Sequence, residues 1–223
     1  MAHPAQNEFV GRIKAIFPGH FRGSRVLEVG SLDINGTIRA LFEGCDYTGI
    51  DVGPGPGVDV VCEGQNFEGP DASYDVVISC ETMEHNPYWA ETFANMVRLA
   101  KPGGLIVMTC ATTGRKEHGT TRTTPGDSPL TVAKGWNYYR NLTARDFEDA
   151  GVLKPLALRF FATSYDDYDL YFVGSKTPAT PAQEQALVEL KAMYRRRNYG
   201  TIKGLKRAFK AACIAYRHSA EAR

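Results

Sequence analysis

The chain has 223 residues, of which 43% are hydrophobic and 23% are charged, and its formal net charge is only +1 at pH 7. Length and composition fit one sizeable globular domain with a small appendage, and no apolar run approaches the length that would span a membrane. The N-terminus, MAHPAQNE, lacks the basic and apolar regions of a signal peptide, so we expect a cytoplasmic protein.

Apolar runs alternate with helical patterns along the first half of the chain. We expect a helix over residues 7–17, a buried strand over 25–29, a helix over 34–42, and strands over 47–51, 58–62 and 74–79. A helix over 87–100 follows, and Pro102-Gly103-Gly104 ends it before a strand over 105–110. Strands separated by helices predict a doubly wound parallel sheet with helices on both faces.

The second half of the chain has a different pattern. A polar stretch over 112–137 has no clear periodicity, and a helix over about 143–150 follows it. Strands over 156–162 and 169–174 are joined by a link that is too short for a helical crossover, so we expect them to be antiparallel. We place the main domain at 1–178, with a lid at 112–140 that binds the acceptor, and a basic helical extension at 179–223.

The stretch VLEVGSLDING, residues 26–36, suggests a ligand site at the end of the first strand. In open parallel sheets ligands bind beyond the carboxyl ends of the strands, and Gly30 lets the backbone approach a ligand closely. The helix expected from Ile34 would turn its N-terminal amides toward the same place. Glu28 would repel a pyrophosphate and favour a cationic or zwitterionic ligand, while Asp51 can accept hydrogen bonds from ribose hydroxyls. Together with Leu32 in the loop, Glu28 argues against an NAD-dependent dehydrogenase.

Four motifs over residues 24–111 resemble those of the class I methyltransferases that use S-adenosylmethionine, in particular the small-molecule, type 11-like group. VLEVGSLDING is similar to their first motif, YTGIDVG to the second, and VDVVCEGQNF to the segment that cradles adenine. YDVVISCETMEHNPYWAETFANMVRLAKPGGLIVMTC is similar to the fourth strand, its helix and the fifth strand, and DLYFVGS to the antiparallel final strand. The resemblance implies a Rossmann-like sheet of about seven strands, mostly parallel, with S-adenosyl-L-methionine as cofactor.

The resemblance also implies a set of cofactor-binding residues. They are Glu28, Gly30, Ser31, Asp33, Gly36, Asp51, Val52, Glu63, Gly64, Cys80 and Glu81. One departure concerns the first loop, in which Leu32 occupies the middle glycine position of the family pattern and Gly36 arrives two residues late. Asp33 either contacts the ammonium group of the cofactor or caps the next helix.

The lid carries the candidate acceptor residues, because long loops at the carboxyl ends of a sheet are usually functional. Its basic and hydroxyl-bearing side chains suit a hydroxylated, anionic acceptor, and we assign substrate contacts to Arg115, Arg122, Trp136, Tyr138 and Tyr139. His118 is the candidate general base, since an imidazole titrates near neutral pH, and His85 is a second candidate. We expect no metal ion, because no cluster of His, Asp and Glu occurs at ligand spacing.

These residues favour an S-adenosylmethionine-dependent methyltransferase that O-methylates a hydroxylated small molecule such as a sugar or a nucleotide-linked sugar. Three alternatives remain: an N-methyltransferase of a small molecule, an RNA methyltransferase that uses the basic tail, and a cofactor-binding scaffold without transfer activity. An RNA enzyme would bind its substrate with a steep salt dependence.

The tail is electrostatically distinct from the rest of the chain. Residues 191–223 contain ten Lys or Arg and a single acid. A helix over 201–217 has an apolar stripe on one side, formed by Ile202, Leu205, Phe209, Ala212, Cys213 and Tyr216. We interpret the stripe as packing on the domain or on a second subunit, which would make a homo-oligomer. Contact with an anionic membrane surface is an alternative, and nucleic acid is disfavoured because no RNA-binding module accompanies the helix.

Overall fold

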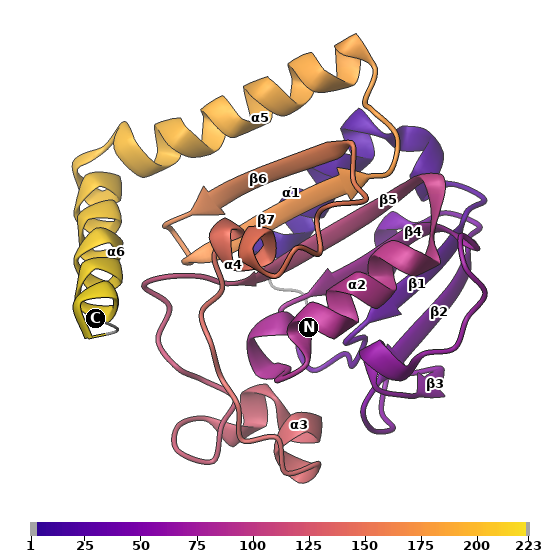
Figure 1. Ribbon diagram of the computed structural model, residues 1–223, viewed down its shortest axis with the longest axis horizontal. Coiled ribbons are helices and arrows are strands. Elements are labelled where there is room, and N and C mark those ends of the chain that lie inside the picture. Colours follow the sequence, from indigo (N-terminus) through magenta and orange to yellow (C-terminus); the bar gives the residue numbers. More distant parts are fainter. Residues whose placement is uncertain (1–3, 222–223) are drawn as a thin grey trace.

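A seven-stranded sheet forms the centre of the computed structural model, which describes residues 4–221 (Figure 1). The strand order is β3-β2-β1-β4-β5-β7-β6, and β7 runs antiparallel to both neighbours while the other paired strands are parallel. The strands are β1 (Arg25–Val29), β2 (Asp46–Asp51), β3 (Val60–Val61), β4 (Tyr74–Cys80), β5 (Ala100–Ala111), β6 (Leu158–Ser164) and β7 (Asp169–Ser175). The expected α/β class and the antiparallel strand near the end of the sheet are confirmed.

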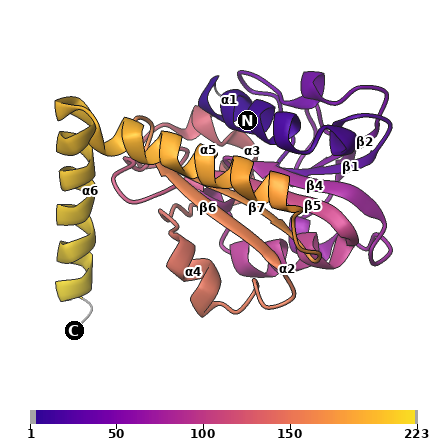
Figure 2. The same ribbon diagram turned by 90° about the horizontal axis from the view of Figure 1, so that it is seen from above.

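Helices cover both faces of this sheet (Figure 2). The α-helices are α1 (Pro4–Ile16), α2 (Trp89–Leu99), α3 (Pro129–Ala133), α4 (Ala144–Asp149), α5 (Pro181–Tyr199) and α6 (Ile202–Glu221). Successive strand residues point to opposite faces, so Val26 packs in the cluster that includes α1 and α5, and Leu27 packs in the one that includes α2 and α4. The apolar runs recognised in the sequence are therefore buried on both sides.

The helix expected over residues 34–42 is wrong. Only a short 3-10 turn forms there, at Arg39–Leu41. Asp33 accepts a hydrogen bond from the backbone N–H of Gly36 at 2.8 Å, which closes a turn instead of starting a helix. The Arg39 side chain then reaches across to the carbonyl oxygen of Gly57 at 2.5 Å. Consequently the α-helical N-terminus that we expected beside the ligand is absent from this part of the described chain.

The apolar stripe of the C-terminal helix does not pack on the domain, and this part of the prediction is also wrong. Ile202 is 76% exposed and Phe209 is 72% exposed. Small residues face inward instead, namely Gly204, Ala208 and Ala211. Figures 1 and 2 both show α6 projecting from the body at the end of α5, which it contacts. A second subunit or a membrane surface as the stripe's partner stays a prediction.

None of the helices in the described part of the chain combines the length and the apolar character that crossing a membrane requires. Helix α5 attaches to the sheet through Leu187, Leu190 and Tyr194, which are buried in the same cluster as α1. The boundary placed at residue 178 stays a prediction.

Candidate functional site

A pocket lies beyond the carboxyl ends of β1, β2 and β4, where the strand order reverses. It contains about 580 Å³ of space, including the part open to solvent. One wall consists of strand ends and the loops that follow them, including Val29, Gly30, Ile50, Asp51, Val52, Glu81 and Thr82. The opposite wall is the lid, from Asp127 to Thr131 together with Trp136.

Asp51 is the acid at the end of β2, and the backbone holds its carboxylate in place. Its two oxygens accept hydrogen bonds from the N–H of Leu32 at 3.0 Å and from its own neighbour Val52 at 2.7 Å. Burial raises the pKa of Asp51, and these two backbone hydrogen bonds lower it in part. Each oxygen keeps a lone pair that can accept from a ligand hydroxyl, and apolar side chains such as Val52 and Leu130 form the adjoining walls. A carboxylate beside apolar walls suits a nucleoside.

The loop after β1 is shaped by two close contacts. Gly30 has a φ of +81°, and a Cβ at this position would lie 1.8 Å from the Oγ1 of Thr82, so the residue must be glycine to let the loops after β1 and β4 meet. Leu32, which departs from the family's glycine pattern, packs its side chain under Gly55 of the next loop. The first loop is thus attached to residues 54–57 and does not continue into a helix.

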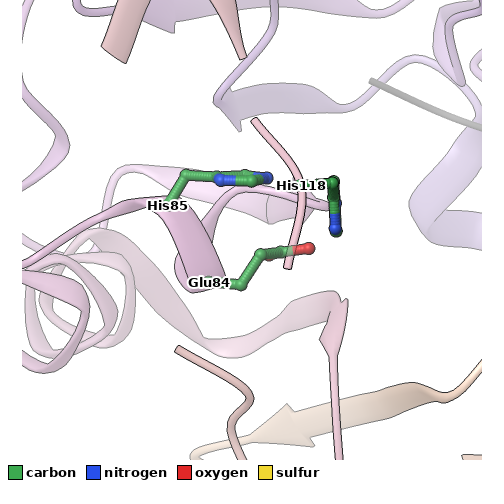
Figure 3. A group of neighbouring side chains, drawn as sticks. All are labelled: Glu84, His85 and His118. Atoms are coloured by element: carbon green, nitrogen blue, oxygen red, sulfur yellow. The ribbon is translucent and has the colours of Figure 1, made fainter. Parts of the chain in front are cut away.

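Two histidines and a glutamate lie together beside the pocket, which His85 lines (Figure 3). Glu84 and His85 belong to the 3-10 turn Met83–His85 that follows β4, whereas His118 comes from the lid. The two imidazole rings are 4.9 Å apart at 87°, and Tyr139 packs against both at 5.5 and 4.9 Å. Burial lowers the pKa of His85 to about 3 and lowers that of His118 as well. Both rings are therefore neutral near pH 7.

Buried carboxyl groups lie close to these rings. Glu84 is fully buried, and burial together with the charge of Glu81 raises its pKa well above the ordinary value. Glu81 accepts a hydrogen bond from Thr109 at 2.9 Å and has a φ of +52°, which is rare for a residue with a side chain. Burial also raises the pKa of Asp169 to about 8, although Arg115 opposes this shift. Backbone strain and buried acids in one place are typical of functional sites.

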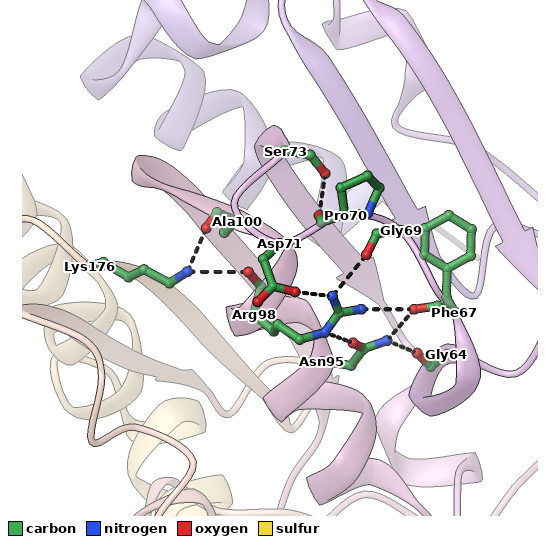
Figure 4. A network of polar contacts seen from close by, with 10 residues as sticks. All are labelled: Gly64, Phe67, Gly69, Pro70, Asp71, Ser73, Asn95, Arg98, Ala100 and Lys176. Atoms are coloured by element: carbon green, nitrogen blue, oxygen red, sulfur yellow. Dashed lines mark hydrogen bonds and ion pairs between the residues drawn. The ribbon is translucent and has the colours of Figure 1, made fainter.

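Helix α2 holds the segment that contributes Gly64 to the pocket (Figure 4). Asn95 donates hydrogen bonds to the carbonyl oxygens of Gly64 at 2.7 Å and Phe67 at 3.1 Å. Arg98 binds the same segment through Gly69 and through an ion pair with Asp71. Because α2 also packs on the sheet, this network fixes the position of residues 64–71 relative to β1 and β4.

The lid is fastened to the rim of the pocket at several points. Leu130 packs on Gly53, where an added Cβ would lie 2.9 Å from the leucine side chain. Lys134 forms an ion pair with Glu63 at 2.6 Å, and the ring of Trp136 lies 5.6 Å from that of Tyr88. The lid therefore closes one side of the pocket.

Comparison with known proteins decides the family. A family model described as a methyltransferase domain matches residues 1–148, which is more than half of the chain. The chain belongs to this family. It is an S-adenosylmethionine-dependent methyltransferase, as the motifs implied. No curated protein sequence matches the chain significantly.

Solved structures share the fold at low sequence identity. Phosphoethanolamine N-methyltransferase 2 of Haemonchus contortus has a TM-score of 0.52 at 15% identity, over 85% of this chain and 49% of that one. Geranyl diphosphate C-methyltransferase of Streptomyces coelicolor A3(2) also has a TM-score of 0.52, at 12% identity, over 78% of this chain and 79% of that one. Their acceptors differ in kind, and a shared fold does not fix the substrate.

Several predicted site residues of the methyltransferase line the pocket. Those predicted for the cofactor are Gly30, Asp51, Val52, Gly64 and Glu81, and those predicted for the acceptor side are His85 and Trp136. Tyr139 and His118 are connected to this group through their ring contacts with His85. The structure thus brings the strand-end residues and part of the lid together around one space.

Other predicted residues lie outside the pocket lining and make contacts within the chain. Ser31 and Cys80 are buried, Asp33 and Gly36 form the turn described above, and Glu63 pairs with Lys134. Arg115 pairs with Asp169 at 3.1 Å, Arg122 pairs with Glu117 at 2.7 Å, and Tyr138 is partly buried. Their roles in binding stay predictions.

Glu28 also lies outside the pocket lining. It shares a face of β1 with Val26, whereas the pocket is reached from Val29 and Gly30. The hydroxyl of Tyr47 donates a hydrogen bond to Glu28 at 2.9 Å, and Arg39 lies 3.8 Å away. Burial raises the pKa of Glu28 to about 7. A role at the ammonium group of the cofactor stays a prediction.

Sequence reasoning missed several residues of the site. Leu130 and Thr131 line the pocket from a lid that had no periodicity to place them. Glu84 was not among the predicted site residues, although its neighbour His85 was. The expectation that ligating side chains do not cluster is wrong, since Glu84, His85 and His118 meet. The sequence did contain a signal for this cluster, because Glu84 and His85 are adjacent and closely follow a buried strand.

Proposed function

We propose that this methyltransferase transfers the methyl group of S-adenosylmethionine to a hydroxyl of a small molecule such as a sugar or a nucleotide-linked sugar. Residues 1–178 form the catalytic domain, residues 112–140 form the lid over the acceptor, and residues 179–223 form the basic extension. The observation that carries the proposal is the contact between the imidazole of His85, which lines the pocket, and that of His118 from the lid; burial lowers the pKa of both.

The cofactor supplies an activated methyl group on a sulfonium, so the chain has to align the acceptor and exclude water. As the bond between acceptor oxygen and methyl carbon forms, the bond between sulfur and carbon breaks, and S-adenosylhomocysteine leaves. A neutral hydroxyl must lose its proton in this step, which an amine acceptor does not require in the same way. The two histidines are the groups of the chain that act on that hydroxyl.

A second pocket supports a polar acceptor. It is lined by lid residues that include Lys116, His118 and Thr124, by Lys210 of α6, and by four acids, Glu117, Asp127, Asp166 and Asp167. His118 belongs to this pocket, and its ring contacts His85, which lines the cofactor pocket. An acceptor held among these charged and hydroxyl side chains would present a hydroxyl at the shared wall.

The test has two parts. Calorimetry should give saturable binding of S-adenosylmethionine, and labelled cofactor should then transfer its methyl group to members of a panel of sugars, nucleotide sugars, other hydroxylated compounds and amines. His118→Asn should lower turnover and leave cofactor affinity nearly unchanged. Cofactor binding without transfer to any acceptor would support a scaffold, and transfer only to amines would replace O-methylation by N-methylation.

A further inference from the structure

Three side chains with metal-ligating atoms converge on one point at the wall between the two pockets. One ligand atom each from Glu84, His85 and His118 lies within 4.8 Å of the others (Figure 3). Two of these residues sit side by side in the turn after β4, and the third arrives from the lid 33 positions further along the chain. Side chains from separate elements are therefore placed around one point.

Several of these polar atoms are buried and lack a hydrogen-bond partner. His85 is 2% exposed and Glu84 is 0% exposed. Neither ring nitrogen of His85 has a partner, and Oε2 of Glu84 has none, although Oε1 accepts from the N–H of Ala111 at 3.1 Å. Leaving a polar atom buried and unpaired costs about 1–3 kcal/mol, so unpaired acceptors rarely gather in one place. A cation at their meeting point would satisfy one ring nitrogen of His85 and Oε2 of Glu84 together.

The ring of His118, the lid histidine, is held in an orientation that suits metal binding. Its Nδ1 lies 3.0 Å from the carbonyl oxygen of Lys116, so Nδ1 carries the proton and donates, and Nε2 keeps a free lone pair. Metal-binding histidines usually donate their second N–H to a carbonyl or carboxylate in this way, which fixes the ring. Tyr139 packs against both imidazoles and limits their rotation.

A further carboxylate lies close by. Oε1 of Glu81 accepts from Thr109, whereas Oε2 is buried without a partner. The charge of Glu81 acts on the pKa of both Glu84 and His118, which places it beside the cluster. Glu81 therefore adds negative charge near a cation at the cluster, while the charge of Arg115, which acts on the pKa of both histidines, opposes it.

We propose that Glu84, His85 and His118 bind one divalent transition-metal ion such as Mn²⁺, Fe²⁺ or Zn²⁺. Two imidazoles with a carboxylate suit these ions, whereas Mg²⁺ and Ca²⁺ prefer all-oxygen sites. Three ligands from the protein leave coordination positions open for another molecule. Because His85 lines the cofactor pocket and His118 lines the lid pocket, those positions lie where the acceptor and the methyl group would meet.

This inference rests on the proposed O-methylation for its functional meaning and specifies what the two histidines do. A bound cation lowers the pKa of a hydroxyl that it ligates, as it does for water. The hydroxyl proton then leaves to solvent, the oxygen forms a bond to the methyl carbon, and the sulfur keeps the electrons of the broken bond. Under this scheme the histidines hold the cation and are not themselves the base.

Metal binding by the full chain tests the proposal directly. After treatment with a chelator, the protein is titrated with MnCl₂ by calorimetry and with CoCl₂ by visible absorption, which responds to ligation by nitrogen. We expect one ion per chain, and at least about a tenfold loss of affinity in Glu84→Gln, His85→Asn and His118→Asn. His20→Asn is the matched control, because His20 lies outside the cluster and its ring contacts the Gly103 carbonyl. It should bind like the wild type.

Two results would overturn the inference: no saturable binding of either ion by the wild type, or equal affinity in the wild type and in His118→Asn. His118 is only partly buried, so its replacement should leave the fold intact even if changes at Glu84 do not. Cofactor titrations on the same samples separate the two proposals. Cofactor binding and methyl transfer without metal binding would refute the metal site alone, whereas metal binding without transfer to any hydroxyl would refute the O-methylation alone.

Discussion

Replacing Asp51 by alanine is expected to weaken S-adenosylmethionine binding about 10- to 100-fold. The carboxylate ends β2 at the pocket and has acceptor capacity beyond its hydrogen bonds to Leu32 and Val52. A hydrogen bond to a charged group contributes about 1.5–3 kcal/mol, and each 1.4 kcal/mol corresponds to about a tenfold change in Kd. The change also removes the acceptor that fixes the Leu32 amide, so the loss should lie toward the upper end.

Asp51→Asn should behave nearly like the alanine variant. Its amide oxygen can still accept from Leu32, but its NH₂ group would then face the N–H of Val52, and two donors repel each other. The matched control is Asp46→Ala, which removes an acid from the opposite end of the same strand, where the side chain is 73% exposed.

Calorimetric titration of each variant with S-adenosylmethionine measures the effect, and thermal unfolding without cofactor reports any general loss of stability. We expect a weakened Kd for both Asp51 variants and an unchanged Kd for Asp46→Ala. A Kd for Asp51→Ala within about twofold of the wild type would refute the assignment of this carboxylate to the ribose. Removal of a charged hydrogen-bond partner should cost more binding free energy than a twofold change represents.

Gly30→Ala should lower the free energy of unfolding by about 1–3 kcal/mol in urea titrations, since φ is +81° and the space is occupied; Gly19→Ala, where a Cβ meets nothing within 4 Å, should not. Burial raises the pKa of Glu28 from 4.5 to about 7, so its contribution is full below pH 4.5 and falls as the pH rises to about 7. Glu28→Gln should therefore gain stability relative to the wild type across that window, by up to about 1.4 kcal/mol per pH unit, and a constant difference between pH 5 and pH 8 would contradict the buried-acid argument. Lys134→Met removes the partly exposed ion pair with Glu63 and should change the free energy of unfolding by less than about 1 kcal/mol and the cofactor Kd by at most a few-fold; a larger effect on Kd would mean that this contact holds the lid closed.

Local patterns in the sequence were sufficient to predict which segments form the strands of the sheet. The apolar runs at 25–29, 47–51 and 74–79 became strands with nearly the expected bounds, because a strand buried on both faces must be apolar throughout. The strand expected at 105–110 is longer, since β5 spans Ala100–Ala111 and includes Pro102-Gly103-Gly104. The helix over 87–100 was recognised for a similar reason, since one face of α2 packs on the sheet. The strand expected at 58–62 shortened to Val60–Val61 at the exposed edge, where few contacts select its length.

The helix expected over 34–42 did not form because long-range contacts outweighed a local apolar pattern. Leu32 packs under Gly55, and Arg39 reaches Gly57 and Asp59. These partners lie 18 to 23 positions away in the chain, and no helical periodicity reports them. The apolar stripe of α6 is a second case in which the local pattern was not sufficient. The amphipathic helix was predicted correctly, but its pattern does not identify the surface against which the stripe packs.

The sequence by itself determined the alternation of strands and helices, the acid at the tip of β2 and the family, because each depends on residues close together in the chain. Only the tertiary structure decided that Glu28 contacts Tyr47 and Arg39 instead of lining the pocket, and that a lid histidine meets the Glu84-His85 pair. Such contacts depend on how a long loop without periodicity folds back over the sheet. Packing between distant segments determines that fold, and no periodic pattern in the sequence reports it.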